Sequence, residues 1–118
     1  MDELTERLSN GDYPVVVGGP TPTLKEFHER LDDIGYVFIK FTGTRGGTDL
    51  GIRLDRDKSD LGAANFDEGS GTAHVEGTLI LNDDPVRCVA DIDLATLSGT
   101  GHLVLVDMSE VEELETAS

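Results

Sequence analysis

The chain has 118 residues and carries 24 acidic against 9 basic side chains, which gives a formal net charge of −15. A chain of this length is the usual size of one domain and buries roughly 65% of the surface that its unfolded form exposes, so it needs no disulfide staple. The single cysteine, Cys88, excludes an internal disulfide and a zinc site built from cysteines. We therefore expect one folded domain over residues 1–118.

The acidic excess is spread along the whole chain and has two explanations. Asp is more frequent than Glu and Arg more frequent than Lys, which resembles proteins of salt-loving organisms and favours a solvation adaptation. The alternative is a surface that meets a basic partner or mimics nucleic acid, and mimicry needs its charge on one face. Under either explanation, so negative a charge argues against direct binding to nucleic acid or to an anionic membrane, because a protein needs a basic surface to bind them.

The sequence also carries no targeting or membrane signal that we recognise. Met1–Leu4 has neither a basic region nor an apolar run of the kind that begins a secretory signal. No stretch approaches the eighteen or so apolar residues that a membrane helix requires. We expect a soluble, cytoplasmic protein.

The first predicted elements, in chain order, are a short helix, a strand and a capped helix. The short helix covers Asp2–Leu8, and the valine-rich segment Tyr13–Val17 fits a strand because β-branched side chains suit a pleated surface. A second helix is predicted over Thr23–Ile34, where Thr23 and Glu26 have the spacing of a capping box. Its apolar stripe consists of Leu24, Phe27, Leu31 and Ile34. Gly35 follows as its C-cap.

Five strands with short turns are predicted after this helix. They cover Tyr36–Phe41, Asp49–Leu54, Ala73–Leu81, Val86–Leu94 and His102–Val106. Glycine-rich or polar turns join them at 42–48, 82–85 and 98–101. A long polar segment, Arg56–Thr72, interrupts the series with only Leu61 and Phe66 as apolar anchors. The acidic tail over 109–118 is compatible with a short helix or with a frayed end.

This order of elements predicts an α+β fold. We expect a mostly antiparallel sheet of five to six strands, with one amphipathic helix packed on one face and a C-terminal three-strand meander. A doubly wound parallel sheet is disfavoured, because no βαβ repetition follows the first unit.

Strand alternation places ionisable side chains on one face of the predicted meander. The candidate catalytic residues are His74, Glu76, Asp91 and Asp93, with Asp49, Arg53 and His102 on flanking strands. An acid, a base and an imidazole would then lie within a few ångströms of one another. The ordinary alternative is a solvated sheet face with cross-strand ion pairs. The Arg56–Thr72 loop would convert this face into a pocket if it folded over it as a lid.

Arginines are the candidate ligand-binding residues, because a guanidinium on an acidic protein is a natural anchor for a carboxylate or phosphate. They are Arg45, Arg53 and Arg87. The segment 18–22 resembles a phosphate-binding turn and 55–60 begins like a calcium loop, but both lack the defining residues, so we interpret them as a structural turn and a solvated loop. Cys88 is predicted to be a small core residue. No metal or cofactor is predicted.

Three functional hypotheses follow from this sequence. The first is a non-catalytic binding or accessory domain that recognises a protein partner or small ligand through its sheet and loops, as a monomer or a small homo-oligomer. The second is a small enzyme or ligand carrier with a pocket between the ionisable sheet face and the 56–72 loop. The third is an acidic inhibitor that mimics nucleic acid. The first ranks above the second because the sequence contains no catalytic motif.

Overall fold

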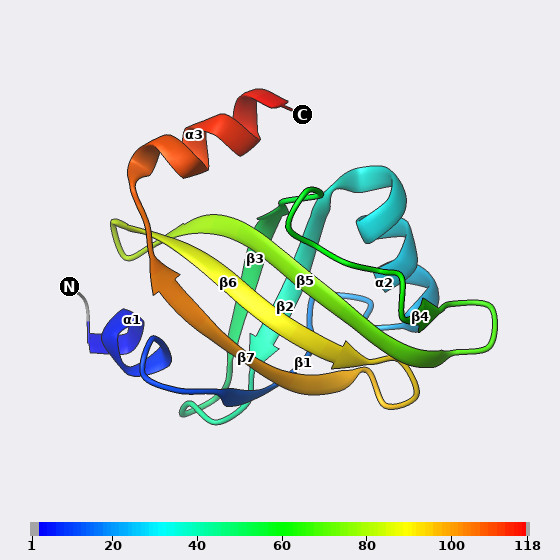
Figure 1. The fold of residues 1–118 in the computed structure, drawn as a ribbon. Coiled ribbons are helices and arrows are strands. Elements are labelled where there is room, and N and C mark those ends of the chain that lie inside the picture. Colours follow the sequence, from blue (N-terminus) through cyan, green and yellow to red (C-terminus); the bar gives the residue numbers. More distant parts are fainter. Residues whose placement is uncertain (1–2, 118) are drawn as a thin grey trace.

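The computed structural model describes residues 3–117, with side chains described for residues 3–114. Its main feature is a closed antiparallel barrel of six strands, shown in Figure 1. These strands are β1 (Tyr13–Val17), β2 (Tyr36–Phe41), β3 (Thr48–Leu54), β5 (Ser70–Leu81), β6 (Asp84–Asp93) and β7 (Ser98–Leu105). Neighbours in this order pair with each other, and β7 returns to pair with β1. The short strand β4 (Ala64–Asn65) pairs with the first two residues of β5.

The predicted α+β, mostly antiparallel arrangement is therefore confirmed, but the sheet is closed where we expected an open one. The meander of β5, β6 and β7 is present. Closure needs two pairings between strands far apart in the sequence, β1 with β7 and β3 with β5. A closed sheet has its core inside, which changes where the helices pack.

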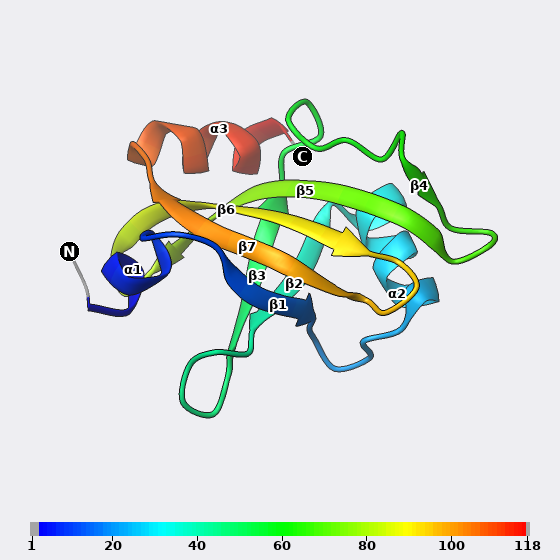
Figure 2. The same cartoon turned by 60° about the horizontal axis from the view of Figure 1, so that its bottom comes forward.

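The helices lie at the two ends and on the outside of the barrel. Helix α1 (Glu3–Leu8) lies at one end, and α2 (Leu24–Glu29) with its continuation η1 (Arg30–Ile34) lies at the other, as Figures 1 and 2 show. Helix α3 (Met108–Ala117) crosses the outer surface of β3, β5 and β6. Asp2 and Ser118 of the predicted terminal elements fall outside the described residues. No helix within residues 3–117 is long and apolar enough to cross a membrane.

The core is the inside of the barrel, as strict alternation along the strands predicts. In β2, for example, Val37, Ile39 and Phe41 are fully buried while the residues between them are partly exposed. Leu8 from α1 and Phe27 and Leu31 from α2 and η1 join the same core cluster. The predicted helix thus closes an end of the barrel, where we expected it to cover one face of an open sheet.

The start of α2 confirms half of the predicted capping box. The Thr23 hydroxyl accepts the backbone N–H of Glu26 at 3.2 Å. The Glu26 carboxylate does not return to the cap, because it pairs with Arg30 one turn later at 3.1 Å. The other end of the helix is also as expected, since Gly35 adopts a left-handed conformation with φ of 74°.

The prediction that Ile34 belongs to the buried stripe is wrong. The last turn of the helix is a π-turn, in which Gly35 donates its N–H to the carbonyl of Arg30, five residues back. A wider turn rotates the residues that follow it away from an α-helical stripe. Ile34 is accordingly 52% exposed, whereas Phe27 and Leu31 are 1% exposed.

Two predicted turns are shifted. Residues 98–101 belong to β7, and the reversal occurs before them, where Leu97 has a positive φ. The β5–β6 turn consists of only Asn82 and Asp83, with φ values of 48° and 71°, so Pro85 lies inside β6. Positive φ at both central residues is the geometry of a two-residue hairpin turn, which matches the twist of the strands.

The Arg56–Thr72 segment runs along the edge of β5. His74 and Asp60 exchange backbone hydrogen bonds of 2.9 and 3.0 Å, and β4 pairs with the first residues of β5. Leu61 and Phe66 pack against the core, as predicted for the two anchors. We considered this loop as a lid over the ionisable face, and the structure shows its backbone groups paired with the edge of β5 beside that face.

The contact that closes the barrel requires a glycine. β3 and β5 form only two residue pairs, Arg53 with Thr78 and Leu54 with Gly77. A Cβ atom at position 77 would lie 2.4 Å from the carbonyl oxygen of Arg53, which is backbone and has no freedom to move aside. Closure of the barrel therefore depends on the missing side chain at this position.

We expect Gly77→Ala to destabilise the protein by about 3 kcal/mol, because the added methyl group forces the two closing strands apart. Gly43→Ala is the matched control, since its Cβ would meet only ordinary contacts of 3.8 and 3.9 Å with Pro14. Urea unfolding followed by circular dichroism measures both. Equal stability of the two variants would contradict the proposed role of Gly77.

Candidate functional site

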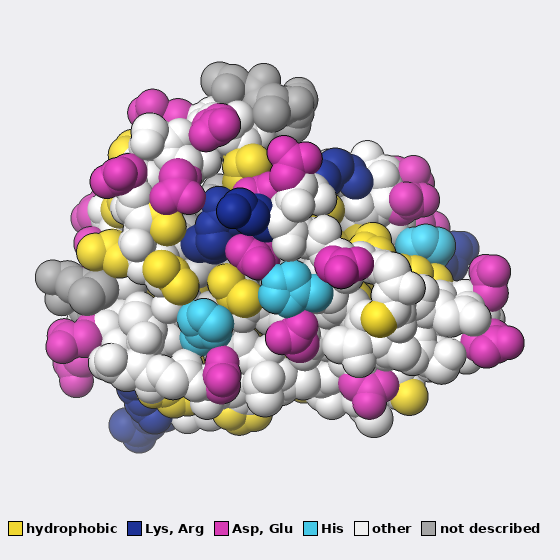
Figure 3. Space-filling view, in the orientation of Figure 1, with side chains coloured by type: hydrophobic (Ala, Val, Ile, Leu, Met, Phe, Trp, Pro, Cys, Tyr) yellow, Lys and Arg dark blue, Asp and Glu magenta, His cyan; other side chains and the backbone are white. Residues whose placement is uncertain are grey.

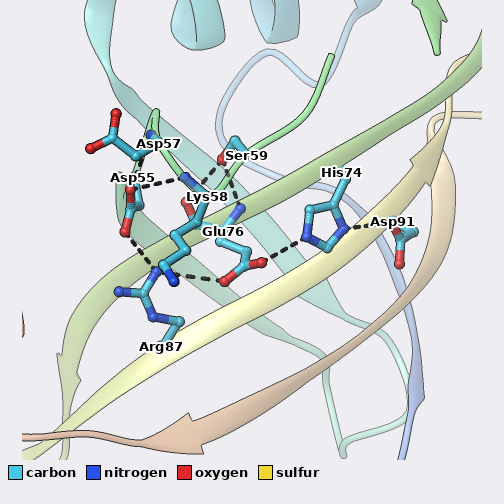
Figure 4. Close-up of polar contacts among 8 residues, drawn as sticks. All are labelled: Asp55, Asp57, Lys58, Ser59, His74, Glu76, Arg87 and Asp91. Carbon is cyan, nitrogen blue, oxygen red and sulfur yellow. Dashed lines mark hydrogen bonds and ion pairs between the residues drawn. The ribbon is translucent and has the colours of Figure 1, made fainter. Parts of the chain in front are cut away.

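Three of the predicted catalytic residues form a hydrogen-bonded row across β5 and β6. His74 Nε2 lies 2.7 Å from Glu76 Oε2, and His74 Nδ1 lies 2.8 Å from Asp91 Oδ1 (Figure 4). The register places His74 directly opposite Asp91 and puts Glu76 two residues along the same strand, so all three point outward. Both ring nitrogens of His74 are thus engaged by carboxylates.

Arg87 continues this row into a network of ion pairs. Its Nη1 atom lies 2.9 Å from Asp55 Oδ2 and 3.6 Å from Glu76 Oε1, and its Nη2 atom lies 3.1 Å from Glu110 Oε1. The side chains of Arg87 and Asp55 are only 13% and 11% exposed. The other oxygen of Asp55 accepts two backbone N–H groups of the following turn, each at 3.2 Å. The network joins the end of β3, the middle of β5 and β6, and α3.

The network shifts the pKa of both of its cations upward. Hydrogen bonds to Glu76 and then to Asp91 raise the pKa of His74 above its usual 6.5 and outweigh partial burial, which lowers it. Burial also opposes the charge of Arg87, but hydrogen bonds to Asp55 and Glu110 prevail and raise its pKa. Both cations are therefore stabilised in their charged forms by the carboxylates around them.

The structure separates Asp93 from the other predicted catalytic residues. Its carboxylate accepts the N–H of Ala95 at 2.9 Å and so belongs to the turn between β6 and β7. Two members of the network were missed. Asp55 was expected in a solvated loop but is 7% exposed, and Glu110 lies in the tail. No local signal marks either residue, because their common partner Arg87 is distant in the sequence.

The outward row of ionisable groups lies on the outside of the barrel, and a small pocket of about 210 Å³ adjoins it at Asp55, Arg87 and Glu110. Figure 3 shows imidazole, basic and acidic groups together at the surface of this face, with further carboxylates scattered around its rim. Within the described part of the chain, no three His, Cys, Asp or Glu side chains converge as a metal ion requires. Ionisable groups that pair with one another across neighbouring strands stabilise strand pairing, and His74 and Arg87 are both engaged in this way.

The three candidate arginines differ sharply in their surroundings. Arg87 is committed to the ion pairs above, and Arg45 is exposed in the loop between β2 and β3. Arg53 lies on β3 with its guanidinium 5.6 Å from the centre of the Tyr36 ring, and no carboxylate among the described residues pairs with it. Only Arg53 has both a partly enclosed position and a charge that no ion pair satisfies.

Arg53 lines a groove of about 440 Å³ where β3 and β5 separate. Beyond the two closing pairs, the first part of β3 (48–52) pairs only with β2, and the end of β5 (79–81) pairs only with β6. The facing edges of β3 and β5 therefore diverge. The lining residues are Tyr36, Asp49, Leu50, Gly51, Arg53, Thr78, Leu79, Ile80, Leu81 and Val111. Val111 of α3 is 3% exposed, which shows that the helix covers part of this seam. We refer to this feature as the seam groove.

Two buried polar atoms at the seam groove have no hydrogen-bond partner among the described residues. They are Arg53 Nε and Thr78 Oγ1, and their residues are register partners in the closing pair. The side chain of Thr78 is almost entirely buried, since the residue is 2% exposed. Buried polar atoms are nearly always paired in folded proteins, so an unpaired couple beside a groove calls for an explanation, and a bound ligand or water is one.

The sequence matches no protein-family model, and no curated protein is similar enough to count as a relative.

Two other sequence features have structural roles. Gly19 donates its N–H to the carboxylate of Asp49 at 2.9 Å, so the turn that resembles a phosphate site already holds an internal carboxylate. Cys88 is fully buried in the barrel, and burial raises the pKa of its thiol to about 12. A thiol this hard to deprotonate is a core residue, as predicted.

We expect Arg87→Met to destabilise the protein by about 3 kcal/mol, because it leaves the buried Asp55 carboxylate without its cation. Arg45→Met removes the same charge from an exposed loop and should change the stability by less than about 0.5 kcal/mol. Urea unfolding of both variants and the wild type tests this. A double variant Asp55→Asn, Arg87→Met that is no more stable than Arg87→Met would argue against the ion pair as the cause.

We expect the stability advantage of the wild type over His74→Gln to depend on pH. Because the folded-state pKa of His74 is raised, its stabilising effect is complete below the unfolded value and disappears as the pH rises through the folded value. Urea unfolding between about pH 5.5 and about pH 9 measures this difference. His28→Gln, at a ring that stacks on Phe66 at 4.1 Å, is the control. A difference that does not change with pH would refute the coupling.

Proposed function

We propose that this protein is a non-catalytic binding domain whose ligand site is the seam groove. The observation that carries the proposal is the pair of buried, unpartnered polar atoms, Arg53 Nε and Thr78 Oγ1, on the closing residues of the barrel. The groove has the volume of a small-molecule site, and its lining combines apolar side chains with polar ones, among them Asp49, Arg53 and Thr78.

The geometry of the ionisable face argues against a catalytic role there. A general base needs a free lone pair within reach of a substrate proton. His74 uses one ring nitrogen on Glu76 and the other on Asp91, at 2.7 and 2.8 Å. The enzyme hypothesis therefore loses the imidazole on which it depended, while the binding hypothesis gains a groove on the neighbouring seam.

The acidic-inhibitor hypothesis gains no support from the visible charge pattern. A mimic of duplex nucleic acid needs carboxylates in two rows along one face. On the face in Figure 3, acidic side chains lie both in the centre and around the margin, interspersed with imidazole and basic groups. This scatter is what general solvation of an acidic surface produces.

We expect neutral aromatic and aliphatic fragments to bind in the seam groove. In a screen by two-dimensional amide NMR, the resonances of Gly51, Leu79 and Leu81 should shift, and those of His74 and Asp91 should not. Leu79→Trp should abolish these shifts, because the larger ring fills the groove. Leu105→Trp is the matched control, since Leu105 is 49% exposed and is not among the lining residues. Fragments that bind elsewhere, or bind equally to both variants, would refute the groove as the site.

A further inference from the structure

The chemistry of the two unpartnered atoms defines what they can bind. A guanidinium nitrogen only donates hydrogen bonds, and a threonine hydroxyl donates one as well as accepting. Side chains of directly opposed residues lie close on the same face of a sheet, so Arg53 and Thr78 can address one group. The group that satisfies both is an oxygen acceptor, and the planar guanidinium favours a carboxylate because its fork matches two oxygens.

The charge of the groove favours a single negative charge on the ligand. Arg53 is the one cation among its lining residues, and the protein as a whole carries a formal charge of −15. The Asp49 carboxylate also lines the groove and is held by the N–H of Gly19. A dianion such as a phosphate ester would meet one cation and a repulsive surrounding field, whereas a monoanion is balanced by Arg53.

Five of the ten residues that line the groove are aliphatic, and one of them, Ile80, lies on the same outward face as Thr78. Leu79 and Leu81 continue the inward-facing series of β5 and pack against the core, but the divergence of β3 leaves them half-buried. Leu50 faces them from β3, and Val111 lies against the seam from α3. An apolar body placed here would remove these side chains from water.

We propose that the seam groove binds an amphipathic monocarboxylate. Its carboxylate accepts hydrogen bonds from Arg53 and Thr78, and its apolar body lies against Ile80 and Val111, which line the groove on the same outer face. This inference rests on the proposed binding function and adds the chemical class of the ligand.

The test uses octanoate as the probe and octylammonium as a probe with the same tail and the opposite charge. Octanoate should shift the amide resonances of Gly51, Thr78 and Leu79 saturably, and octylammonium should not. Arg53→Met, which keeps the aliphatic stem over Tyr36, should weaken octanoate binding at least about tenfold. Thr78→Val, which keeps the side-chain shape, should weaken it roughly fivefold. Arg45→Met should bind as the wild type does.

Three outcomes would overturn this ligand class. Octylammonium binding as well as octanoate would show that the tail alone is recognised. Unchanged octanoate affinity in Arg53→Met would place the anion elsewhere. Shifts of the same resonances on addition of unlabelled protein would show that a second copy of the chain fills the groove. Neutral fragments need no anion contact, so their binding in the groove without octanoate binding would overturn the ligand class and leave the binding function standing.

Discussion

Closure of the barrel depends on the backbone contact between β3 and β5 at Gly77, and most other features of the molecule follow from how short that contact is. β5 has 12 residues, and one of its edges is shared among three partners. β4 and the segment before it pair with its first part, β3 pairs with Gly77 and Thr78 only, and the last three residues are left to β6 alone. Barrel strands tilt and stagger, so a strand that meets its neighbour for two residues diverges from it afterwards. The seam groove is the direct consequence of that divergence.

The ion-pair network around Arg87 lies beside the same seam, and Arg87 itself belongs to β6, the neighbour of β5. Its carboxylates come from the end of β3, from β5 and from α3, so one guanidinium connects the three elements that border the seam groove. A buried ion pair contributes little net stability compared with an apolar contact of the same shape, but breaking it is costly. Its main effect is therefore positional, because α3 can cover the groove only while Glu110 and Val111 keep their places. The sequence offered the ionisable face as a candidate site beside the alternative of a solvated face with cross-strand ion pairs, and it is better understood as the support of the proposed groove site.

The sequence predicts local structure well here and fails where distant segments meet. Alternation over two residues places His74, Glu76 and Asp91 on one face whichever way the sheet is arranged, and the Thr23 hydroxyl caps its helix within one turn. Closure could not be predicted in this way, because β1–β7 and β3–β5 pairing is decided by the shape of the whole sheet. Asp55 and Glu110 were missed for the same reason, since each is defined by a tertiary contact with Arg87. Ile34 was misplaced by a single π-turn, which the apolar spacing does not reveal.

The isolation of Arg53 is unusual in a chain with 24 acidic side chains. Leaving a buried donor unpaired costs about 1–3 kcal/mol, and a surface carboxylate would ordinarily remove that cost. The acidic residue that lines the groove, Asp49, is engaged by the N–H of Gly19 at 2.9 Å. Thr78 adds a second unpaired atom where a valine of the same shape would remove the penalty. Among the described residues no carboxylate pairs with Arg53, and in the proposed site this leaves its guanidinium available to the carboxylate of the ligand.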